Sequence, residues 1–171
     1  MNEIDLTILK GAIFSDDRKY RYALWRVWSS NTKPLMAIGL NPSIASERKD
    51  DPTVTRLIAR AYQSKYGGLF MANLYAFIST NPESLLNKDD AVGEFTDYYI
   101  KEMIRLSEIQ LCGWGSFKPV IYRAPAVYKM LTNPVCLGIN ADGNPHHPLY
   151  IAYDVPMIPY RILKGEIEQQ P

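Results

Sequence analysis

Four runs of consecutive apolar residues stand out along the chain, each about as long as one β-strand. They cover residues 34–40, 69–74, 109–114 and 134–139. The runs are continuous, whereas a strand with one wetted face alternates apolar and polar residues. Continuous runs are typical of strands that are covered on both faces, as in a parallel sheet.

The segment before these runs has a different pattern. Residues 13–20 form a short apolar piece followed by a polar turn, and residues 21–28 read RYALWRVW, which is rich in aromatic residues. The polar positions of this second piece are spaced for one solvent-facing side. The two pieces together predict an antiparallel N-terminal hairpin.

Helical patterns separate the apolar runs. Residues 51–64 keep helical spacing behind Pro52, a favourable first-turn residue, and Gly67-Gly68 ends this segment. Shorter or similar patterns occupy residues 81–86, 94–106 and 124–131, the last of which we expect to begin somewhat earlier.

Alternating strands and helices predict right-handed βαβ units. We therefore expect an α/β fold with three α/β/α layers, a central four-stranded parallel sheet and the N-terminal antiparallel hairpin. Residues 1–171 form one domain in this interpretation, with a hairpin extension (1–33), a core (34–150) and a C-terminal tail (151–171).

Composition narrows the class of protein. The chain has 171 residues, of which 47% are hydrophobic and 22% charged, and its formal net charge is +1. This is a globular composition, and the near-neutral charge argues against charge-driven binding to a long duplex while leaving a local basic patch possible. The N-terminus does not resemble a signal peptide, and no apolar run approaches the roughly 20 residues that cross a bilayer. We expect a cytoplasmic protein without a membrane partner, either monomeric or dimeric.

Cysteine and histidine usage gives no sign of a metal site. Cys112 and Cys136 lie inside apolar runs, which favours buried, reduced thiols. No Cys/His spacing is typical of zinc. We expect neither a metal nor another cofactor.

Ligands of open α/β sheets bind at the carboxyl ends of the strands, so the residues that follow each run are the candidates. The first run leads into Gly39-Leu40-Asn41-Pro42-Ser43. Pro42 favours extended backbone at Asn41, which presents the amide of Asn41 at the sheet edge. The alternative is an Asx-type turn, in which Asn41 bonds only its own backbone.

The second and third runs end on further candidates. Asn73 is the one polar residue among apolar neighbours; it either ties two loops together or reads the hydrogen-bonding edge of a base. Trp114 lies between Gly113 and Gly115 in a tight turn that either binds phosphate or is merely closely packed.

The loop after the fourth run contains His146 and His147, the two histidines of the chain. Neighbouring residues point apart in extended backbone, so they are unsuited to chelating one metal. Each is either a surface residue or a donor to a ligand or a developing negative charge. Earlier in the chain, Asp50, Asp51 and Thr53 either contact a sugar or phosphate or cap the helix that follows them.

The order GLNPS, MANLYAF, LCGWG and HHPLY resembles the motif order of the uracil-DNA glycosylase superfamily, over roughly residues 34–150. The first motif is similar to that of the mismatch-specific branch, which has Asn at this position. The chain also resembles an uncharacterised family of bacterial and phage proteins, whose signature runs GLNPS, DDPT, NLYAF and HPLY.

The glycosylase resemblance implies a role for each matching residue. Asn41 positions the attacking water, Asn73 reads an extruded base, and His147 stabilises negative charge on the leaving base. Leu149 fills the vacated stack. The remaining ligand-binding candidates are the loop and aromatic residues Gly39, Leu40, Pro42, Ser43, Asp51, Thr53, Trp114 and His146, together with Tyr75 and Phe77 as an aromatic floor.

The resemblance implies a glycosylase-like hydrolase that cleaves the N-glycosidic bond of uracil or a modified base, in DNA repair or phage defence. Its partner is then a nucleic acid or a nucleotide. A second hypothesis is a protein that binds or sequesters a nucleotide or modified base without chemistry. A third is a partner-binding protein that uses exposed tyrosines.

Overall fold

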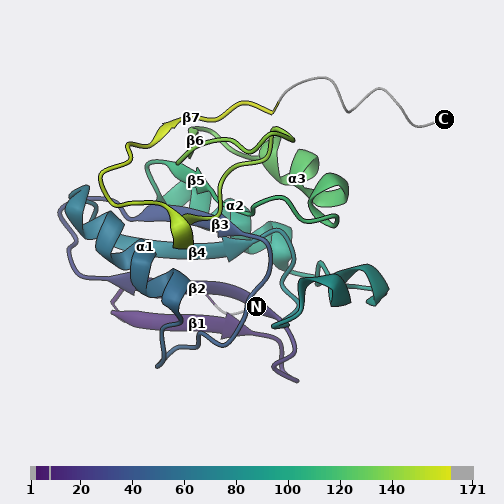
Figure 1. Ribbon diagram of the computed structural model, residues 1–171. Coiled ribbons are helices and arrows are strands. Elements are labelled where there is room, and N and C mark those ends of the chain that lie inside the picture. Colours follow the sequence, from purple (N-terminus) through teal and green to yellow (C-terminus); the bar gives the residue numbers. More distant parts are fainter. Residues whose placement is uncertain (1–2, 8, 163–171) are drawn as a thin grey trace.

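The computed structural model describes residues 3–7 and 9–162, whose centre is a seven-stranded mixed sheet in the order β1-β2-β4-β3-β5-β6-β7 (Figure 1). The strands are β1 (Lys10–Phe14), β2 (Arg21–Val27), β3 (Leu35–Gly39), β4 (Gly68–Asn73), β5 (Gln110–Cys112), β6 (Pro134–Cys136) and β7 (Ile158–Pro159). The α-helices are α1 (Pro52–Gln63), α2 (Thr96–Leu106) and α3 (Val120–Tyr128), and two 3-10 helices are η1 (Pro82–Asn87) and η2 (Pro148–Tyr150).

The predicted parallel core is confirmed. Strand β3 pairs in parallel with both β4 and β5, and β5 pairs in parallel with β6. The last strand lies in the segment that was expected to be a tail, where β7 pairs antiparallel with β6 and Tyr160 is buried. The C-terminal segment therefore contributes to the sheet and to the core, while residues 163–171 lie outside the described part.

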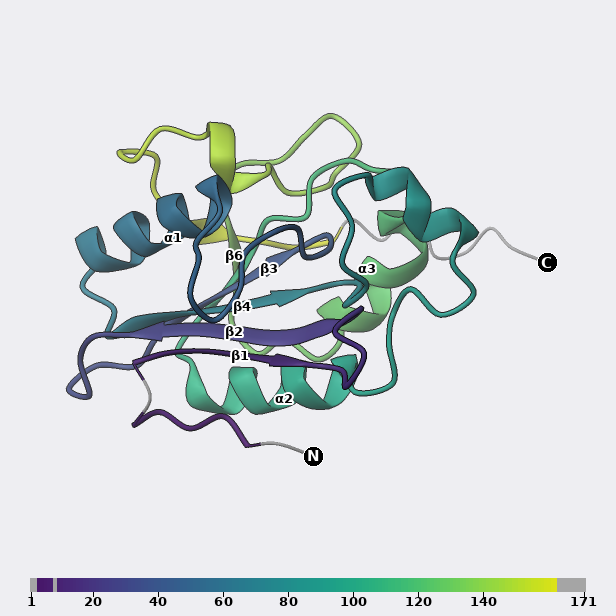
Figure 2. The same ribbon diagram turned by 90° about the horizontal axis from the view of Figure 1, so that it is seen from below.

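The three-layer arrangement is also confirmed. Figure 2 shows α1 on one face of the sheet and α2 on the other. Buried residues of α1 join one apolar cluster with Leu35 and Leu69, whereas α2 and α3 join a second cluster with Met36 and Phe70. Successive residues of a strand thus belong to clusters on opposite faces of the sheet. Because both faces are buried, the strands are continuously apolar.

The N-terminal hairpin is part of the same sheet. Strands β1 and β2 pair antiparallel, and β2 also pairs antiparallel with β4. The prediction that one side of β2 faces solvent is wrong, because Arg21 and Arg26 are only 2% and 3% exposed. The loop after β3 covers them: Arg21 donates to the Ala45 carbonyl and Arg26 to the Ser46 carbonyl.

The helices begin and end close to the predicted positions. Helix α1 starts at Pro52, where the Asp51 side chain accepts a hydrogen bond from the Val54 amide. Helix α2 begins two residues later than expected, and α3 begins at Val120 but ends at Tyr128, before the predicted limit at residue 131. No helix in the described part of the chain has the length and apolar character needed to span a membrane.

The strand order determines where a ligand site can form. From β3 the chain crosses to β4 on one side, and from β4 it returns past β3 to β5 on the other. At the carboxyl ends of the neighbouring strands β3 and β5, the chain leaves in opposite directions, from β3 toward β4 and from β5 toward β6. Such a switch point leaves a crevice at the sheet edge, which is the usual ligand site of open α/β sheets.

Candidate functional site

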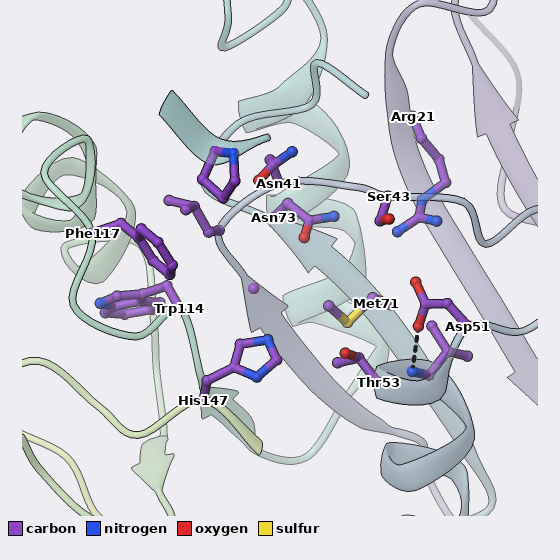
Figure 3. A pocket seen from close by; sticks show the side chains of 14 residues that line it. Arg21, Asn41, Ser43, Asp51, Thr53, Met71, Asn73, Trp114, Phe117 and His147 are labelled. Carbon is purple, nitrogen blue, oxygen red and sulfur yellow. Dashed lines mark hydrogen bonds between the residues drawn. The ribbon is translucent and has the colours of Figure 1, made fainter. Parts of the chain in front are cut away.

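A pocket of about 140 Å³ lies at the carboxyl edge of the parallel strands (Figure 3). Its walls come from strand β2, the end of β3 and the loop after it, the start of α1, the end of β4, the start of η1, and the loops that follow β5 and β6. The lining residues are Arg21, Gly39, Leu40, Asn41, Ser43, Asp51, Thr53, Val54, Met71, Asn73, Pro82, Trp114, Phe117 and His147. The structure thus brings together most of the residues singled out at the strand ends.

Asn73 forms one wall with an amide that is fully buried. It is the last residue of β4, pairs in register with Gly39, and is 4% exposed. Neither its Nδ2 nor its Oδ1 has a hydrogen-bond partner among the described residues. The Asn73 side chain therefore does not tie two loops together through hydrogen bonds to the described residues, which was one of the two roles expected for it.

Gly39 makes room for this amide. A Cβ atom at position 39 would lie 2.9 Å from Asn73 Oδ1 and 2.9 Å from the terminal methyl group of Met71. Distances this short force a side chain to move, so glycine is needed here for close approach.

Asn41 has mainly a local structural role. Its Nδ2 donates to the carbonyl of Pro42 at 3.1 Å and to the carbonyl of Ser79 at 2.8 Å. These bonds use both N–H groups of the amide and hold the loop after β3 against the segment after β4. The side chain lines the pocket, but its donors are directed at the backbone.

His147 enters the pocket from the side opposite Asn73 (Figure 3). Burial lowers the pKa of its imidazole below the ordinary value, and the negative charge of Asp51 partly opposes this. The backbone amide of Leu149 donates to His147 Nδ1 at 3.4 Å. A neutral imidazole that accepts at Nδ1 carries its proton on Nε2, so Nε2–H is a donor at the tip of the ring.

The end of the pocket nearest α1 is charged and polar. Asp51 is 8% exposed and its Oδ1 accepts from the Val54 amide at 2.8 Å, as an N-cap. The two interpretations of Asp51 from the sequence are compatible, since the capping residue also lines the pocket beside Thr53. Asp50 lies elsewhere and forms an ion pair with Arg26 at 2.6 Å.

Arg21 faces Asp51 at this end of the pocket, with Ser43 beside it (Figure 3). Burial lowers the pKa of its guanidinium to about 10, while the charge of Asp51 raises it. Arg21 forms no ion pair with a described carboxylate, and its Nε has no partner within the described residues. A buried cation with so few partners is unusual, because desolvating a charge is costly.

Two aromatic side chains stand at the other end. Trp114 is fully buried, donates from Nε1 to Asn144 Oδ1 at 3.4 Å, and packs edge-on against Tyr160. Phe117 is 48% exposed and lines both this pocket and a shallower neighbouring cavity of about 360 Å³. Phe117 thus lies at the mouth, whereas Trp114 belongs to the wall.

Several predicted site residues lie outside the pocket. The two residues expected to form an aromatic floor do not line this pocket: the hydroxyl of buried Tyr75 donates to the Pro119 carbonyl, and Phe77 packs against Tyr20. Both belong to the core beneath the hairpin. His146 lines the neighbouring cavity, and the side chains of Leu149 and Pro42 line neither space.

The pocket also contains residues that the sequence did not single out, namely Arg21, Val54, Met71, Pro82 and Phe117. Two signals were available. Phe117 comes two residues after the Gly-Trp-Gly turn, and Arg21 is one of two charged residues, with Arg26, in a strand whose other residues are apolar or aromatic. In the described part of the chain, no group of three or more His, Cys, Asp or Glu side chains is placed to hold a metal ion.

Comparisons with known proteins give one assignment. Residues 21–149 match a family model described as a protein of unknown function, DUF1643. No curated protein and no solved structure matches the chain. The match begins at the first pocket residue, Arg21, and ends two residues beyond the last, His147. The chain belongs to the DUF1643 family.

Proposed function

We propose that this protein binds a single nucleobase in the pocket and hydrolyses the N-glycosidic bond that joins this base to its sugar. The observation that carries the proposal is the buried Asn73 amide, whose donor and acceptor both lack a partner among the described residues. Each unsatisfied buried group costs roughly 1–3 kcal/mol. A ligand edge with one acceptor and one donor side by side would satisfy both.

The size of the pocket favours a single ring. A cavity of roughly 150 Å³ accepts a benzene ring, and this pocket has a volume of about 140 Å³. Uracil and its derivatives present an N–H next to a carbonyl on a six-membered ring. Phe117 at the mouth offers a face for such a ring.

His147 supports the hydrolytic part of the proposal. Breaking the N-glycosidic bond leaves an electron pair on the base, and a donor fixed at that point stabilises the developing charge. A neutral imidazole with its proton on Nε2 supplies such a donor. The motif order that resembles the uracil-DNA glycosylases agrees with this assignment of roles.

A second candidate function is binding without chemistry, as in a protein that sequesters a nucleotide or a modified base. One observation favours it. Asn41, the residue that the resemblance makes responsible for the attacking water, has both amide hydrogens directed at backbone carbonyls. An amide in this state holds a loop and is a poor catalyst.

The test is incubation of the protein with a panel of DNA strands and nucleotides that contain uracil or modified bases. Released base is measured by mass spectrometry, and binding of free bases by calorimetry. We expect release of a pyrimidine, which Asn73→Ala and His147→Ala abolish. Asn133→Ala is the matched control, because Asn133 is an exposed asparagine outside the pocket.

The two candidate functions predict different results. If base binding depends on Asn73 but no base is released from any substrate over hours, the hydrolytic function is excluded and binding without chemistry is supported. Binding and release that do not respond to Asn73→Ala would exclude the pocket as the site of either function.

A further inference from the structure

The pocket contains one carboxylate, and it is not at the position that the resemblance indicates. Of the described residues that line the pocket, Asp51 is the one with an acidic side chain. Asn41 is an amide, which does not take up a proton at neutral pH. Any removal of a proton from water in this pocket therefore falls to Asp51 or to His147.

The two carboxylate oxygens of Asp51 have different surroundings. Oδ1 accepts from the Val54 amide and caps α1. Figure 3 shows the other oxygen turned away from the helix, toward Arg21 and Ser43. The cap holds the carboxylate in place and leaves one oxygen directed into the pocket.

Two basic groups lie near Asp51: Arg21 from β2 and His147 from the loop before η2. The negative charge of Asp51 opposes the lowering of the pKa of each by burial. Arg21 and Asp51 face each other without forming an ion pair, although the Arg21 Nε–H has no other described partner. A molecule between them, such as water, would meet a donor on one side and an acceptor on the other.

We propose that Asp51, rather than Asn41, is the general base that activates water in this pocket. This inference rests on the proposed hydrolytic function. Asp51 removes a proton from water, and the water oxygen forms a bond to the anomeric carbon of the sugar. The bond between that carbon and the base nitrogen breaks, and its electron pair goes to the base.

The remaining protons then balance. His147 Nε2–H donates a hydrogen bond to the departing base and keeps its proton, and the sugar keeps the new hydroxyl group. Asp51 gives the proton of the water to solvent, and the base anion takes up a proton from solvent to become the neutral free base. Arg21 is a positioning residue that stabilises the carboxylate and orients the water.

The decisive variant is Asp51→Asn, because Asn caps a helix as well as Asp does and only the basic oxygen is lost. We expect base release under single-turnover conditions to fall by about 10²–10⁴-fold, the usual contribution of a general base. Binding of the free base should change by less than about threefold. Asp90→Asn is the matched control, since Asp90 accepts from the Gly93 amide at 3.0 Å in the same i to i+3 geometry, outside the pocket.

A second variant separates chemistry from structure. Asp51→Ser keeps a capping hydroxyl and removes the carboxylate, so added formate can take the place of the missing group. We expect formate to restore part of the rate of Asp51→Ser and to leave Asp90→Asn unaffected. A purely structural role of Asp51 predicts no rescue.

The outcomes distinguish this inference from the function on which it rests. If the wild type releases base and Asp51→Asn releases it at the same rate, the role of Asp51 as a general base is overturned, whereas the hydrolytic function is not. Loss of release without formate rescue, together with equal loss of base binding, would also overturn it. A wild type that releases no base from any substrate would overturn the hydrolytic function and this role with it.

Discussion

Two buried side-chain amides lie at opposite ends of the parallel sheet, and their surroundings differ completely. Gln110 begins β5, and its Oε1 accepts from the amides of Thr132 and Asn133 at 3.1 and 2.8 Å while Nε2 donates to Ser107 Oγ. Asn73 ends β4, and neither of its polar atoms has a described partner. The amino end of the sheet uses its amide to hold two loops, and the carboxyl end has an amide without a hydrogen-bond partner among the described residues.

The two buried arginines of β2 repeat this contrast. Arg26 donates to Asp50 Oδ1 at 2.9 Å, to the Ser46 carbonyl at 2.6 Å and to the Trp25 carbonyl at 2.7 Å. Arg21 lines the pocket and donates to the Ala45 carbonyl at 2.7 Å, with its Nε unpartnered among the described residues. Buried polar groups that have hydrogen-bond partners stabilise the fold. Buried polar groups without partners reduce stability, and in natural proteins they are often found at functional sites.

The largest expected effect concerns the contrast between the two amides. Asn73→Leu removes both hydrogen bonds to a base and should weaken base binding by roughly a thousandfold, since sites built on polar contacts reject partners that lack them. The free energy of unfolding should rise by roughly 1–3 kcal/mol for each unsatisfied polar group removed, because the lost amide had no partner among the described residues. Calorimetric titration with a pyrimidine and urea denaturation measure the two quantities. A large loss of stability would show that Asn73 is a structural amide like Gln110.

Of the two buried arginines, the one outside the pocket should contribute more to the free energy of unfolding. Arg26→Met breaks a buried, multiply bonded ion pair and should lower the free energy of unfolding by about 3 kcal/mol. Arg21→Met loses one described hydrogen bond and should cost about 1 kcal/mol. Urea denaturation of both variants gives the difference directly. Equal losses would mean that Arg21 is as well satisfied as Arg26.

Gln110→Met tests the structural amide with little change in side-chain volume. It leaves the amides of Thr132 and Asn133 without their acceptor and should cost about 2 kcal/mol of stability. Base binding by the folded variant, measured by calorimetry, should equal that of the wild type. If the fully folded variant binds the base more weakly than the wild type does, Gln110 is not a purely structural amide.

The smallest expected effect is a pH dependence of stability from His147. Its pKa is lowered in the folded state by burial, so the unfolded chain takes up a proton first as the pH falls. This part of the stability is present above about pH 6.5, the ordinary histidine value, and is lost as the pH falls through the lower folded-state pKa. Urea denaturation from pH 7.5 to 5 should show a shallower loss of stability in His147→Gln than in the wild type.

The strands and helices could largely be predicted from the sequence, because each is determined by local patterns. Continuous apolar runs identified the four parallel strands, and Pro52 with its preceding aspartates identified the start of α1. The main error in the elements was β2, whose polar spacing indicated a wetted face. Coverage by the loop after β3 is a long-range contact, and no local pattern encodes it.

The candidate site was predictable only in part. Asn73, Trp114 and His147 follow from the rule that strand ends carry ligand sites, whereas Asp51 was a candidate sugar or phosphate contact at the start of a helix. The pocket contains all four residues. Tyr75 and Phe77 were misplaced because sequence proximity to Asn73 says nothing about the direction of a side chain after the strand has ended. Arg21 was missed because it reaches the pocket from a strand that the sequence assigned to a peripheral hairpin.

By itself, the sequence determined the order of strands and helices, the parallel core and the edge of the sheet where polar residues collect. These depend on residue periodicity and on the handedness of βαβ units, which act over short stretches of chain. Only the tertiary structure decided that Asn41 bonds the backbone and that Asp51 faces Arg21 at one end of the pocket. The pairing of buried polar groups depends on which distant segments meet, and it is this pairing that separates the residues that hold the fold from those left for a ligand.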